Sequence, residues 1–335
     1  MTLPIQRLAF FLYRGYGAVI ETDVPLDGFL KVAQTAPADI RFWLASEPEW
    51  GSRALELPSR PDRTSTLTGS AGEVVRAVFT LGDGEFLHIR YADDTEFVVS
   101  ADGARIFGRW RLPLTLEDTL TYALGPILAL ALRRQGRVCL HASAVEWHGK
   151  AVLFIGSAGA GKSTTAAAMV RHGARLIADD ISALCEAEST FRVFVGQGRV
   201  RLWQESADLL FGPQANLPLL TPNWDKRYFD TGGAVGINDV ETVEISRICL
   251  LGSCGELPLS DQFVIQPSPR HVLMALLGNT HGALFLDRAA RSQEFQFLGR
   301  LVQTVPATVL GEQRFRIPVS ELMQAVENQL SGTVD

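Results

Sequence analysis

The sequence has few cysteines, no long apolar run and no excess of positive charge. Its four cysteines form no Cys-x-x-Cys pair and do not lie among closely spaced histidines; they are Cys139, Cys185, Cys249 and Cys254. We interpret them as buried small apolar residues rather than disulfides or metal ligands, as expected in a reducing compartment. The net charge of −6 argues against a nucleic-acid partner, because such proteins usually carry a basic surface.

Signals for secretion and membrane insertion are also lacking. Residues 1–17 show no basic start, long apolar run or small-residue cleavage site. The most apolar stretch, residues 122–132, is shorter than the ~20 residues of a membrane span, and it contains Gly125 and Pro126. We therefore expect a buried, kinked helix there, no membrane partner and a cytoplasmic location.

The chain of 335 residues is long enough for one large or two ordinary domains. Residues 1–115 contain short alternating or aromatic runs separated by turn residues, which predicts a β-rich N-terminal domain. Within it, residues 45–72 are polar and rich in turn formers, and they predict a long loop. A helical pattern over 116–134, with Thr115 as its cap, predicts a connecting helix. Residues 135–335 then form a second domain.

The second domain opens with the pattern of a P-loop α/β fold. Two apolar strands within 137–156 turn at His148-Gly149, and a glycine-rich loop follows. A helix over about 162–172 ends at Gly173, and residues 175–186 predict a strand with two acids inside it. Strand, glycine loop, helix and acidic strand together indicate an α/β P-loop core.

Residues 156–163 match G-x-x-x-x-G-K-[ST] completely. Glycines allow backbone N–H groups to curl around an anion, and the helix that follows adds its positive end. In this motif Lys162 reaches the β and γ phosphates, and the Ser163 hydroxyl binds Mg²⁺. The residues that we assign to the nucleotide are Gly156, Ser157, Ala158, Gly159, Ala160, Gly161, Lys162, Ser163 and Thr164.

Asp179 and Asp180 are consecutive acids on the apolar segment after the helix. Neighbours on a strand point to opposite faces, so the two carboxylates are expected to have different roles. One would hold Mg²⁺, for which Asp179 is the candidate, and the other would accept a proton from an incoming hydroxyl. The alternative is a structural acid at the end of the strand. His141, which small residues follow, is either a functional side chain or a satisfied core histidine.

The stretch LHASAVEWHGKAVLFIGSAGAGKSTTAAAMVRHGARLIADD, residues 140–180, resembles the catalytic core of HPr kinase/phosphorylase. In that family a histidine strand leads through a hairpin to the P-loop, and an Asp pair follows the helix. The resemblance implies an α/β P-loop kinase core that uses ATP and Mg²⁺. It implies that Asp180 takes the proton of an acceptor serine and that His141 positions it. It also matches the family's phosphate-contacting arginine with Arg227.

The sequence departs from the family at a Glu-x-Arg segment, which corresponds here to GRVRLW. Arg201 stands for the family arginine, but Arg199 occupies the place of the Mg²⁺-binding glutamate. Either the metal site therefore differs from that of the family, or another acid supplies the ligand, for which Asp179 is the candidate. The front region and the RLW segment also resemble an HPr-kinase-like subgroup associated with lasso-peptide biosynthesis. That resemblance implies a peptide or small-protein serine acceptor, such as the C-terminal serine of a lasso-peptide precursor. HPr kinases form hexamers, so the resemblance also allows a homo-oligomer.

Other functions stay open at this stage. A small-molecule kinase shares the same motifs, and so does a nucleotide-dependent switch or ATPase without a phosphoryl acceptor. The lack of an LSGGQ-like signature argues against an ABC ATPase, and the lack of an N-K-x-D motif argues against a GTPase. The missing glutamate also allows a binding protein with impaired catalysis. In the kinase interpretation, the β-rich domain recognises the acceptor by strand addition.

Overall fold

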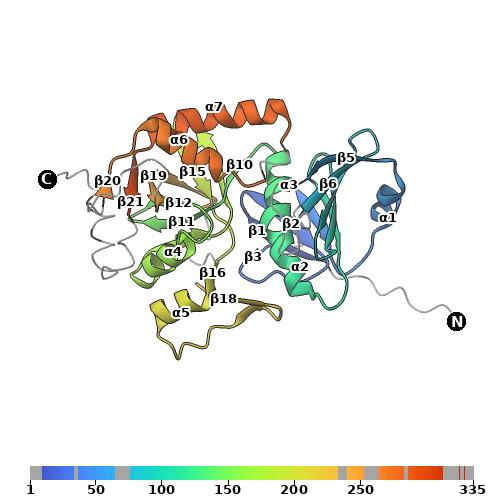
Figure 1. Ribbon diagram of the computed structural model, residues 1–335, viewed down its shortest axis with the longest axis horizontal. Coiled ribbons are helices and arrows are strands. Elements are labelled where there is room, and N and C mark those ends of the chain that lie inside the picture. The colour runs from blue at the N-terminus through green and yellow to red at the C-terminus, as the bar shows by residue number, and fades with distance from the viewer. Residues whose placement is uncertain are drawn as a thin grey trace. The chain divides into compact units, whose positions relative to one another are not determined.

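The computed structural model describes residues 10–33, 37–64, 76–232, 240–252, 264–282 and 286–311, together with 324 and 328. The chain divides into two compact units, residues 1–136 and 137–335. Figure 1 shows the β-rich first unit and the mixed α/β second unit. The predicted combination of a β-rich N-terminal region and an α/β region is thus confirmed.

A nine-stranded sheet forms the first unit, in the order β3-β1-β2-β4-β9-β8-β7-β6-β5. Its strands are mostly antiparallel, but β2 with β4 and β4 with β9 run parallel. The strands are β1 (Phe11–Gly15), β2 (Ala18–Thr22), β3 (Leu30–Lys31), β4 (Ile40–Trp43), β5 (Ser59–Thr64), β6 (Arg76–Leu81), β7 (Phe86–Tyr91), β8 (Glu96–Ser100) and β9 (Arg105–Arg109).

The prediction of a long loop over 45–72 was wrong for its described part. Residues Glu49–Glu56 form helix α1, and Ser59–Thr64 form the edge strand β5. The helix buries Gly51 and Ala54 against the core around Phe107, which outweighs the weak helical propensity of this polar segment. Residues 65–72 lie outside the described part of the chain.

The connecting helical segment consists of α2 (Leu116–Tyr122), a π-helical turn (Ala123–Ile127) and α3 (Leu128–Arg134). Thr115 caps α2 as predicted, because its side chain accepts from the Asp118 N–H while the Asp118 carboxylate accepts from the Thr115 N–H. Pro126 lacks an N–H and lies within the π turn, so the helix is kinked there. Most residues from Ala123 to Arg133 are buried, as the apolar pattern predicts.

A second sheet organises the other unit, in the order β10-β14-β15-β19-β12-β11-β13, with β21 beside β19 and β20 beside β21. The strands are β10 (Val138–Leu140), β11 (Ala142–Trp147), β12 (Lys150–Ile155), β13 (Arg175–Ala178), β14 (Ser182–Ala187), β15 (Thr190–Phe194), β19 (Thr242–Leu251), β20 (Val264–Ile265) and β21 (Ala307–Leu310). β12 runs parallel to β19, and β19 runs parallel to β21.

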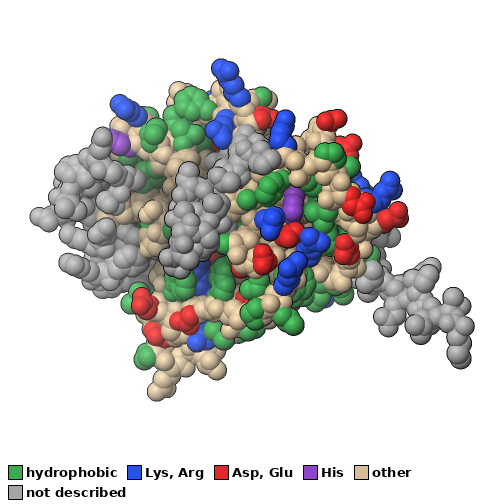
Figure 2. Space-filling view, turned by 45° about the vertical axis from the view of Figure 1, so that its right-hand side comes forward, with side chains coloured by type: hydrophobic (Ala, Val, Ile, Leu, Met, Phe, Trp, Pro, Cys, Tyr) green, Lys and Arg blue, Asp and Glu red, His purple; other side chains and the backbone are tan. Residues whose placement is uncertain are grey.

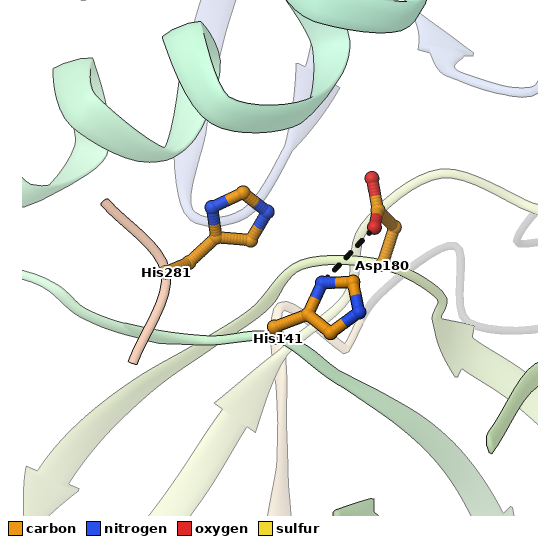
Figure 3. Close-up of side chains that lie close together, drawn as sticks. All are labelled: His141, Asp180 and His281. Atoms are coloured by element: carbon orange, nitrogen blue, oxygen red, sulfur yellow. Dashed lines mark ion pairs between the residues drawn. The ribbon is translucent and has the colours of Figure 1, made fainter. Parts of the chain in front are cut away.

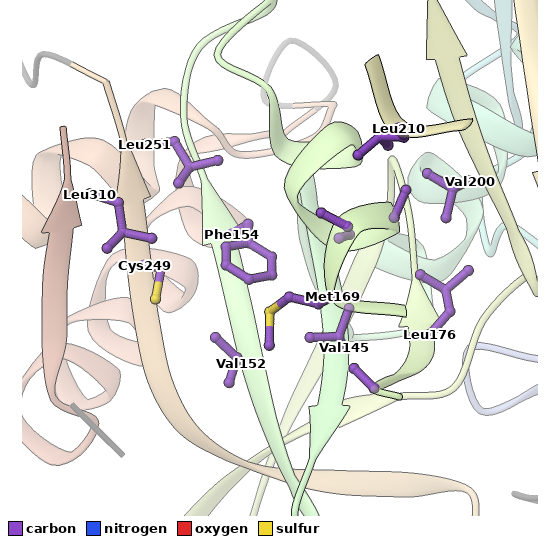
Figure 4. Close-up of a cluster of buried hydrophobic side chains, with 14 of the residues drawn as sticks. Val145, Val152, Phe154, Met169, Leu176, Val200, Leu210, Cys249, Leu251 and Leu310 are labelled. Carbon is purple, nitrogen blue, oxygen red and sulfur yellow. The ribbon is translucent and has the colours of Figure 1, made fainter. Parts of the chain in front are cut away.

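Helices cover both faces of this sheet (Figure 1). Helix α4 (Lys162–Arg171) packs its small side chains on β11 and β12, and Phe154 and Met169 lie at the centre of the resulting apolar cluster (Figure 4). On the opposite face lie α6 (Pro269–Gly278) and α7 (Arg288–Thr304). Phe297 of α7 contacts Phe191 of β15, which fixes that helix on the sheet.

A three-stranded sheet in the order β16-β18-β17 lies beside α4. It contains β16 (Arg199–Trp203), β17 (Leu219–Thr221) and β18 (Trp224–Asp230), and α5 (Gln204–Phe211) follows β16. Val200 and Leu202 lie on one face of this sheet, because alternate residues of a strand share a face, and they pack in the apolar cluster beneath α4.

The described cysteines behave as small core residues: Cys139 and Cys249 are buried and Cys185 is half-buried, whereas Cys254 lies outside the described residues. Over the described ranges we find no helix with the length and apolar character needed to cross a membrane. On the face shown in Figure 2, acidic and basic side chains are interspersed rather than separated by sign.

Candidate active site

The glycine-rich loop connects the end of β12 to the start of α4, as the motif predicts. Gly161 precedes the helix with a φ of 86°, a left-handed conformation that favours glycine. Gly156 is required for a different reason, since a Cβ there would lie 2.8 Å from the carbonyl oxygen of Leu251. These two glycines therefore fix the path of the loop, which ends at the positive N-terminus of α4, where a helix attracts anions.

Lys162 begins α4, and its side chain folds back over the loop. Its Nζ donates to the carbonyl oxygens of Gly156 at 2.7 Å and Ser157 at 3.1 Å. Burial lowers the pKa of Lys162, and the carboxylates of Asp179 and Asp180 oppose this shift. The ammonium group is thus held over the loop and close to both acids, where a phosphate oxygen can replace the two carbonyls.

The two hydroxyl residues after Lys162 face different partners. The Ser163 hydroxyl donates to Oδ1 of Asp179 at 2.9 Å. The Thr164 hydroxyl instead bonds to Ser206 of α5 at 2.9 Å, so its side chain is held on that helix. Ser163 is therefore directed to the acid pair, whereas Thr164 is available to a nucleotide through its backbone.

The acid pair lies at a break in the sheet and not inside one strand, contrary to the expectation for residues 175–186. β13 ends at Ala178 and β14 begins at Ser182, while on the neighbouring chain segment β10 ends at Leu140 and β11 begins at Ala142. The antiparallel pairing Ala144–Ala178 lies on one side of the break and Leu140–Ser182 on the other. The ladder is thus interrupted at matching positions on both segments.

This interruption brings the predicted site residues together. Asp179 is buried, and its Oδ1 accepts from the hydroxyls of Ser143 at 2.5 Å and Ser163 at 2.9 Å. Its Oδ2 accepts from the backbone N–H of Arg201 at 2.9 Å. Asp180 has a φ of 69°, and this left-handed turn separates its side chain from the two hydroxyls that bond to Asp179. The two acids therefore face different surroundings because of the turn and not because of strand alternation.

Asp180 contacts His141 and Arg201. Its Oδ1 lies 3.2 Å from Nδ1 of His141 (Figure 3), and its Oδ2 accepts from the Arg201 guanidinium at 3.1 Å. Burial would raise the pKa of Asp180, but neighbouring positive groups, of which Arg201 is the strongest, lower it below its ordinary value. The carboxylate stays ionised, and with 23% of its side chain exposed it remains accessible from solvent.

His281 is a third member of this group that the sequence pattern did not assign. Its backbone N–H donates to the carbonyl of Cys139, and a bridge joins Thr280 to Leu140, so the 279–281 segment lies along β10. Its ring centroid is 5.5 Å from that of His141 (Figure 3). Because the two histidines are 140 positions apart in the sequence, no local spacing indicates that they are neighbours.

The β16–β18 pair places a basic and aromatic face beside the acids. Arg201, Trp203 and their cross-strand partners Tyr228 and Lys226 share this face. Arg199 belongs to it as well; it pairs with Asp230 and stacks on Tyr228 at 4.1 Å. Position 199, where the resemblance predicts a glutamate, thus carries an arginine that forms an ion pair with Asp230.

Arg227 points away from that face. Its guanidinium bonds to the Gln204 side chain and donates to the Leu217 carbonyl at 2.7 Å. The guanidinium of Arg227 is thus held by Gln204 and Leu217, and its match with the family's phosphate-contacting arginine stays a prediction. Its neighbour Lys226 lies on the opposite side of β18, over the Trp203 ring at 4.7 Å, and its charge lowers the pKa of Lys162.

The oxygens of Ser163 and Asp179 fit a Mg²⁺ ion. Adjacent ligands of an octahedral Mg²⁺ with metal–oxygen distances of about 2.0–2.1 Å lie about 2.9 Å apart. Ser163 Oγ and Asp179 Oδ1 are separated by 2.9 Å. A hydroxyl and a carboxylate are also the hard oxygen ligands that Mg²⁺ prefers. These two residues would hold the ion beside the loop.

Comparison with known proteins gives a match over the same region. Residues 134–199 match the family described as HPr Serine kinase C-terminal domain. The HPr kinase/phosphorylase of Lactobacillus delbrueckii subsp. bulgaricus is 46% identical over 68 residues, which cover 20% of this chain and 22% of that protein. The chain thus spans about a fifth of the length of this curated relative.

The HPr(Ser) kinase/phosphatase of Coxiella burnetii aligns structurally with a TM-score of 0.32 and 14% identity, over 58% of this chain and 98% of that chain.

The family match contains the loop, Ser163, His141 and both aspartates, whereas Arg201, Lys226, Arg227 and His281 lie beyond it. The residues around Asp180 thus come partly from the matched segment and partly from the rest of the second unit. Over residues 134–199, the chain carries the pattern of the HPr Serine kinase C-terminal domain family.

Proposed function

We propose that this protein is an Mg-ATP-dependent kinase that phosphorylates a serine hydroxyl on a peptide or small protein. The observation that carries the proposal is that the two adjacent acids at the sheet break differ in their contacts and in their burial. Asp179 is buried against the Ser163 hydroxyl, whereas Asp180 is half-exposed between His141 and Arg201. On this proposal Asp179 would serve the nucleotide, and Asp180 would be accessible to an acceptor.

The loop and Lys162 would bind the triphosphate. The backbone N–H groups between Gly156 and Ser163 would donate to phosphate oxygens, and the Lys162 ammonium would exchange its two loop carbonyls for the β and γ phosphates. Ser163 and Asp179 would hold Mg²⁺, which neutralises charge on the phosphates when bound. The low exposure of Lys162, 7%, strengthens its attraction to an anion, because little water screens it.

Asp180 would accept the proton of the serine hydroxyl as the serine oxygen attacks the γ phosphorus. A bond forms between these two atoms, the bond from the γ phosphorus to the β,γ-bridging oxygen breaks, and ADP leaves with the electron pair. His141 and Arg201 hold the two carboxylate oxygens in place. Because phosphoryl transfer depends mainly on positioning and electrostatics, a carboxylate of low pKa is sufficient here.

Lys226 is the better candidate for a cation on the transferred group, in place of Arg227. It shares a strand face with Arg201, and its charge acts on Lys162. Arg227 has its guanidinium committed to Gln204 and Leu217. We therefore assign the additional phosphate-facing charge to Lys226 and a structural role to Arg227.

For the acceptor, we propose a serine on a peptide or small protein, with the C-terminal serine of a lasso-peptide precursor as the specific candidate. The resemblance of the front region and of the RLW segment to the lasso-associated subgroup supports this choice. Among the described residues, β3 and β5 are the two edge strands of the first unit's sheet, and a strand edge can bind an extended peptide. Crosslinking of a bound acceptor peptide tests this, since crosslinks confined to 137–335 would contradict recognition by the first unit.

The experiment for the kinase function is mass spectrometry of acceptors incubated with Mg-ATP. The acceptors are peptides that end in serine, the same peptides ending in alanine, and an HPr protein. We expect added phosphate on the serine peptides only, and none with Asp180→Asn or Lys162→Ala. ATP hydrolysis without a modified acceptor would contradict the proposal and favour a switch or a small-molecule kinase.

A further inference from the structure

We infer that His141, Asp180 and His281 form a binding site for one transition-metal divalent cation such as Zn²⁺, separate from the Mg²⁺ position at Ser163 and Asp179. Each of the three residues offers one ligand atom, and these atoms all lie within 4.8 Å of one another. The residues converge from three separate stretches of chain (Figure 3). All three are half-buried, so an ion can reach them from solvent.

The distances suit a small tetrahedral ion. Ligand atoms around a Zn²⁺ with Zn–N and Zn–O bonds of about 2.0–2.2 Å lie about 3.3–3.6 Å apart. Nδ1 of His141 and Oδ1 of Asp180 are already 3.2 Å apart, and His281 completes the set within 4.8 Å. Three protein ligands leave a fourth position for water, as in sites that keep an open coordination position.

The donor types select the class of metal. Two imidazole nitrogens and one carboxylate oxygen favour Zn²⁺, Co²⁺ or Ni²⁺ over Mg²⁺, which prefers oxygen ligands and keeps much of its water. The oxygens near Ser163 show the opposite preference. The two positions are therefore expected to bind different ions at the same time.

Arg201 sets a limit on the affinity. Its guanidinium pairs with Oδ2 of Asp180, which leaves Oδ1 for the metal but places a positive charge nearby. The same bond orients the carboxylate, so that Oδ1 faces the imidazole of His141. Arg201 thus arranges the ligand while weakening the attraction for any cation that binds it.

Occupancy of the site would inhibit the kinase, a consequence that rests on the proposed function. A metal at Oδ1 takes the carboxylate oxygen that faces His141 and would remove Asp180 as a proton acceptor. We therefore expect Zn²⁺ to inhibit phosphorylation without displacing Mg-ATP, and we expect His281→Ala to relieve this inhibition.

The test measures metal binding directly on the full chain, without nucleotide, after treatment with a chelator. Zn²⁺ is titrated calorimetrically into the wild type, His281→Ala, His281→Gln and the control His172→Gln, which changes an exposed histidine outside the cluster. We expect one tight site per chain that is weakened at least ~100-fold in both His281 variants and unchanged in the control. The backbone bond of His281 to Cys139 does not depend on its side chain, so both variants retain it.

Equal affinity in the wild type and in a folded His281 variant would overturn the inference, and so would an equal loss in His172→Gln. Cobalt provides a readout that requires no variant. A Co²⁺-loaded wild-type chain should show the strong visible absorption of a four-coordinate site. The weak absorption of a six-coordinate aqueous ion would contradict the inference. These binding results stand even if no acceptor is ever phosphorylated, so failure of the kinase proposal is distinguishable.

Discussion

The hydroxyl of Ser163 donates to Oδ1 of Asp179 across 2.9 Å, and the same oxygen accepts a second hydroxyl from Ser143 at 2.5 Å. The first bond connects the start of α4 to the end of β13, and the second crosses the broken ladder. Asp179 therefore joins the phosphate loop to the sheet. Two hydroxyls on one oxygen allow the functional and structural contributions of this acid to be separated.

Ser163→Ala and Ser143→Ala should have different effects. Ser163→Ala removes an oxygen that fits Mg²⁺, so the Mg²⁺ concentration for half-maximal phosphorylation should rise by at least ~10-fold. Ser143→Ala leaves that oxygen in place but removes a donor from a buried carboxylate, which should cost about 1–3 kcal/mol of unfolding free energy. Mg²⁺ titrations and urea unfolding check the pair. Equal Mg²⁺ dependence in both variants would contradict the assignment of Ser163.

Asp180→Asn should separate catalysis from nucleotide binding. The amide keeps the shape of the carboxylate but cannot accept the hydroxyl proton, so kcat should fall at least ~100-fold. The affinity for Mg-ATP should change little, because Asp179 and Ser163 are unaltered. Single-turnover kinetics and a fluorescent nucleotide titration provide the two quantities. A variant that retains most of its kcat would exclude Asp180 as the proton acceptor.

Gly156→Ala should be far more harmful than Gly159→Ala. A Cβ at Gly156 would lie 2.8 Å from the Leu251 carbonyl and 2.9 Å from Cβ of Ala160, and backbone there cannot move away easily. At Gly159 the structure shows open space around the added Cβ, and only the φ of 80° costs energy, about 1–2 kcal/mol. ATP affinity and thermal unfolding of both variants check the difference. Comparable losses would mean that the loop does not depend on the close approach at Gly156.

The sequence predicted the local parts of the site because they are encoded by short motifs. Residues 156–163 fix a loop and a helix start through glycine conformations and one lysine, and these need no distant partner. The acid pair was also placed correctly after α4. The surroundings of the pair were not predicted, because the turn at Asp180 and the matching interruption at His141 arise from the pairing of two chain segments.

Residues outside the motif depend on tertiary register. Lys226 and Arg227 are adjacent in sequence, and only the pairing of Lys226 with Trp203 shows which of them shares a face with Arg201. His281 follows α6 and reaches the site through a single bridge to β10. No periodicity of charge or hydropathy records such contacts. The sequence therefore identified the phosphate loop better than the groups that surround Asp180.

Acid should weaken the first unit through Glu96. This carboxylate on β8 bonds to His88 and Arg109, and the His88 bond is the main reason why the pKa of Glu96 falls to about 2 from 4.5. A lowered pKa stabilises the fold above pH 4.5, and the contribution is lost as the pH falls through 2. Glu96→Gln should cost up to roughly 3 kcal/mol at neutral pH, with a deficit that shrinks between these two values.

Urea unfolding of the wild type and Glu96→Gln across that pH range measures the deficit. Glu85→Gln, at an exposed glutamate before β7, serves as the control and should show no comparable deficit. A deficit for Glu96→Gln that is constant with pH would show that shape, and not charge, accounts for its stability.

Lys226→Ala and Arg227→Ala should affect different quantities although the residues are neighbours on β18. Lys226 shares a strand face with Arg201, and its charge lowers the pKa of Lys162, so its loss should lower kcat/KM for Mg-ATP by at least ~10-fold while stability changes little. Arg227 holds Gln204 and the Leu217 carbonyl, so its loss should lower the melting temperature with little change in kcat/KM. Steady-state kinetics at several ATP concentrations, together with thermal unfolding, separate the two effects. Lys226→Arg is the further check, since it keeps the charge and should restore most of the lost rate. If Arg227→Ala instead shows the kinetic defect and Lys226→Ala the loss of stability, the phosphate-facing cation is Arg227, and the β18 face that we assign to the nucleotide is the wrong one.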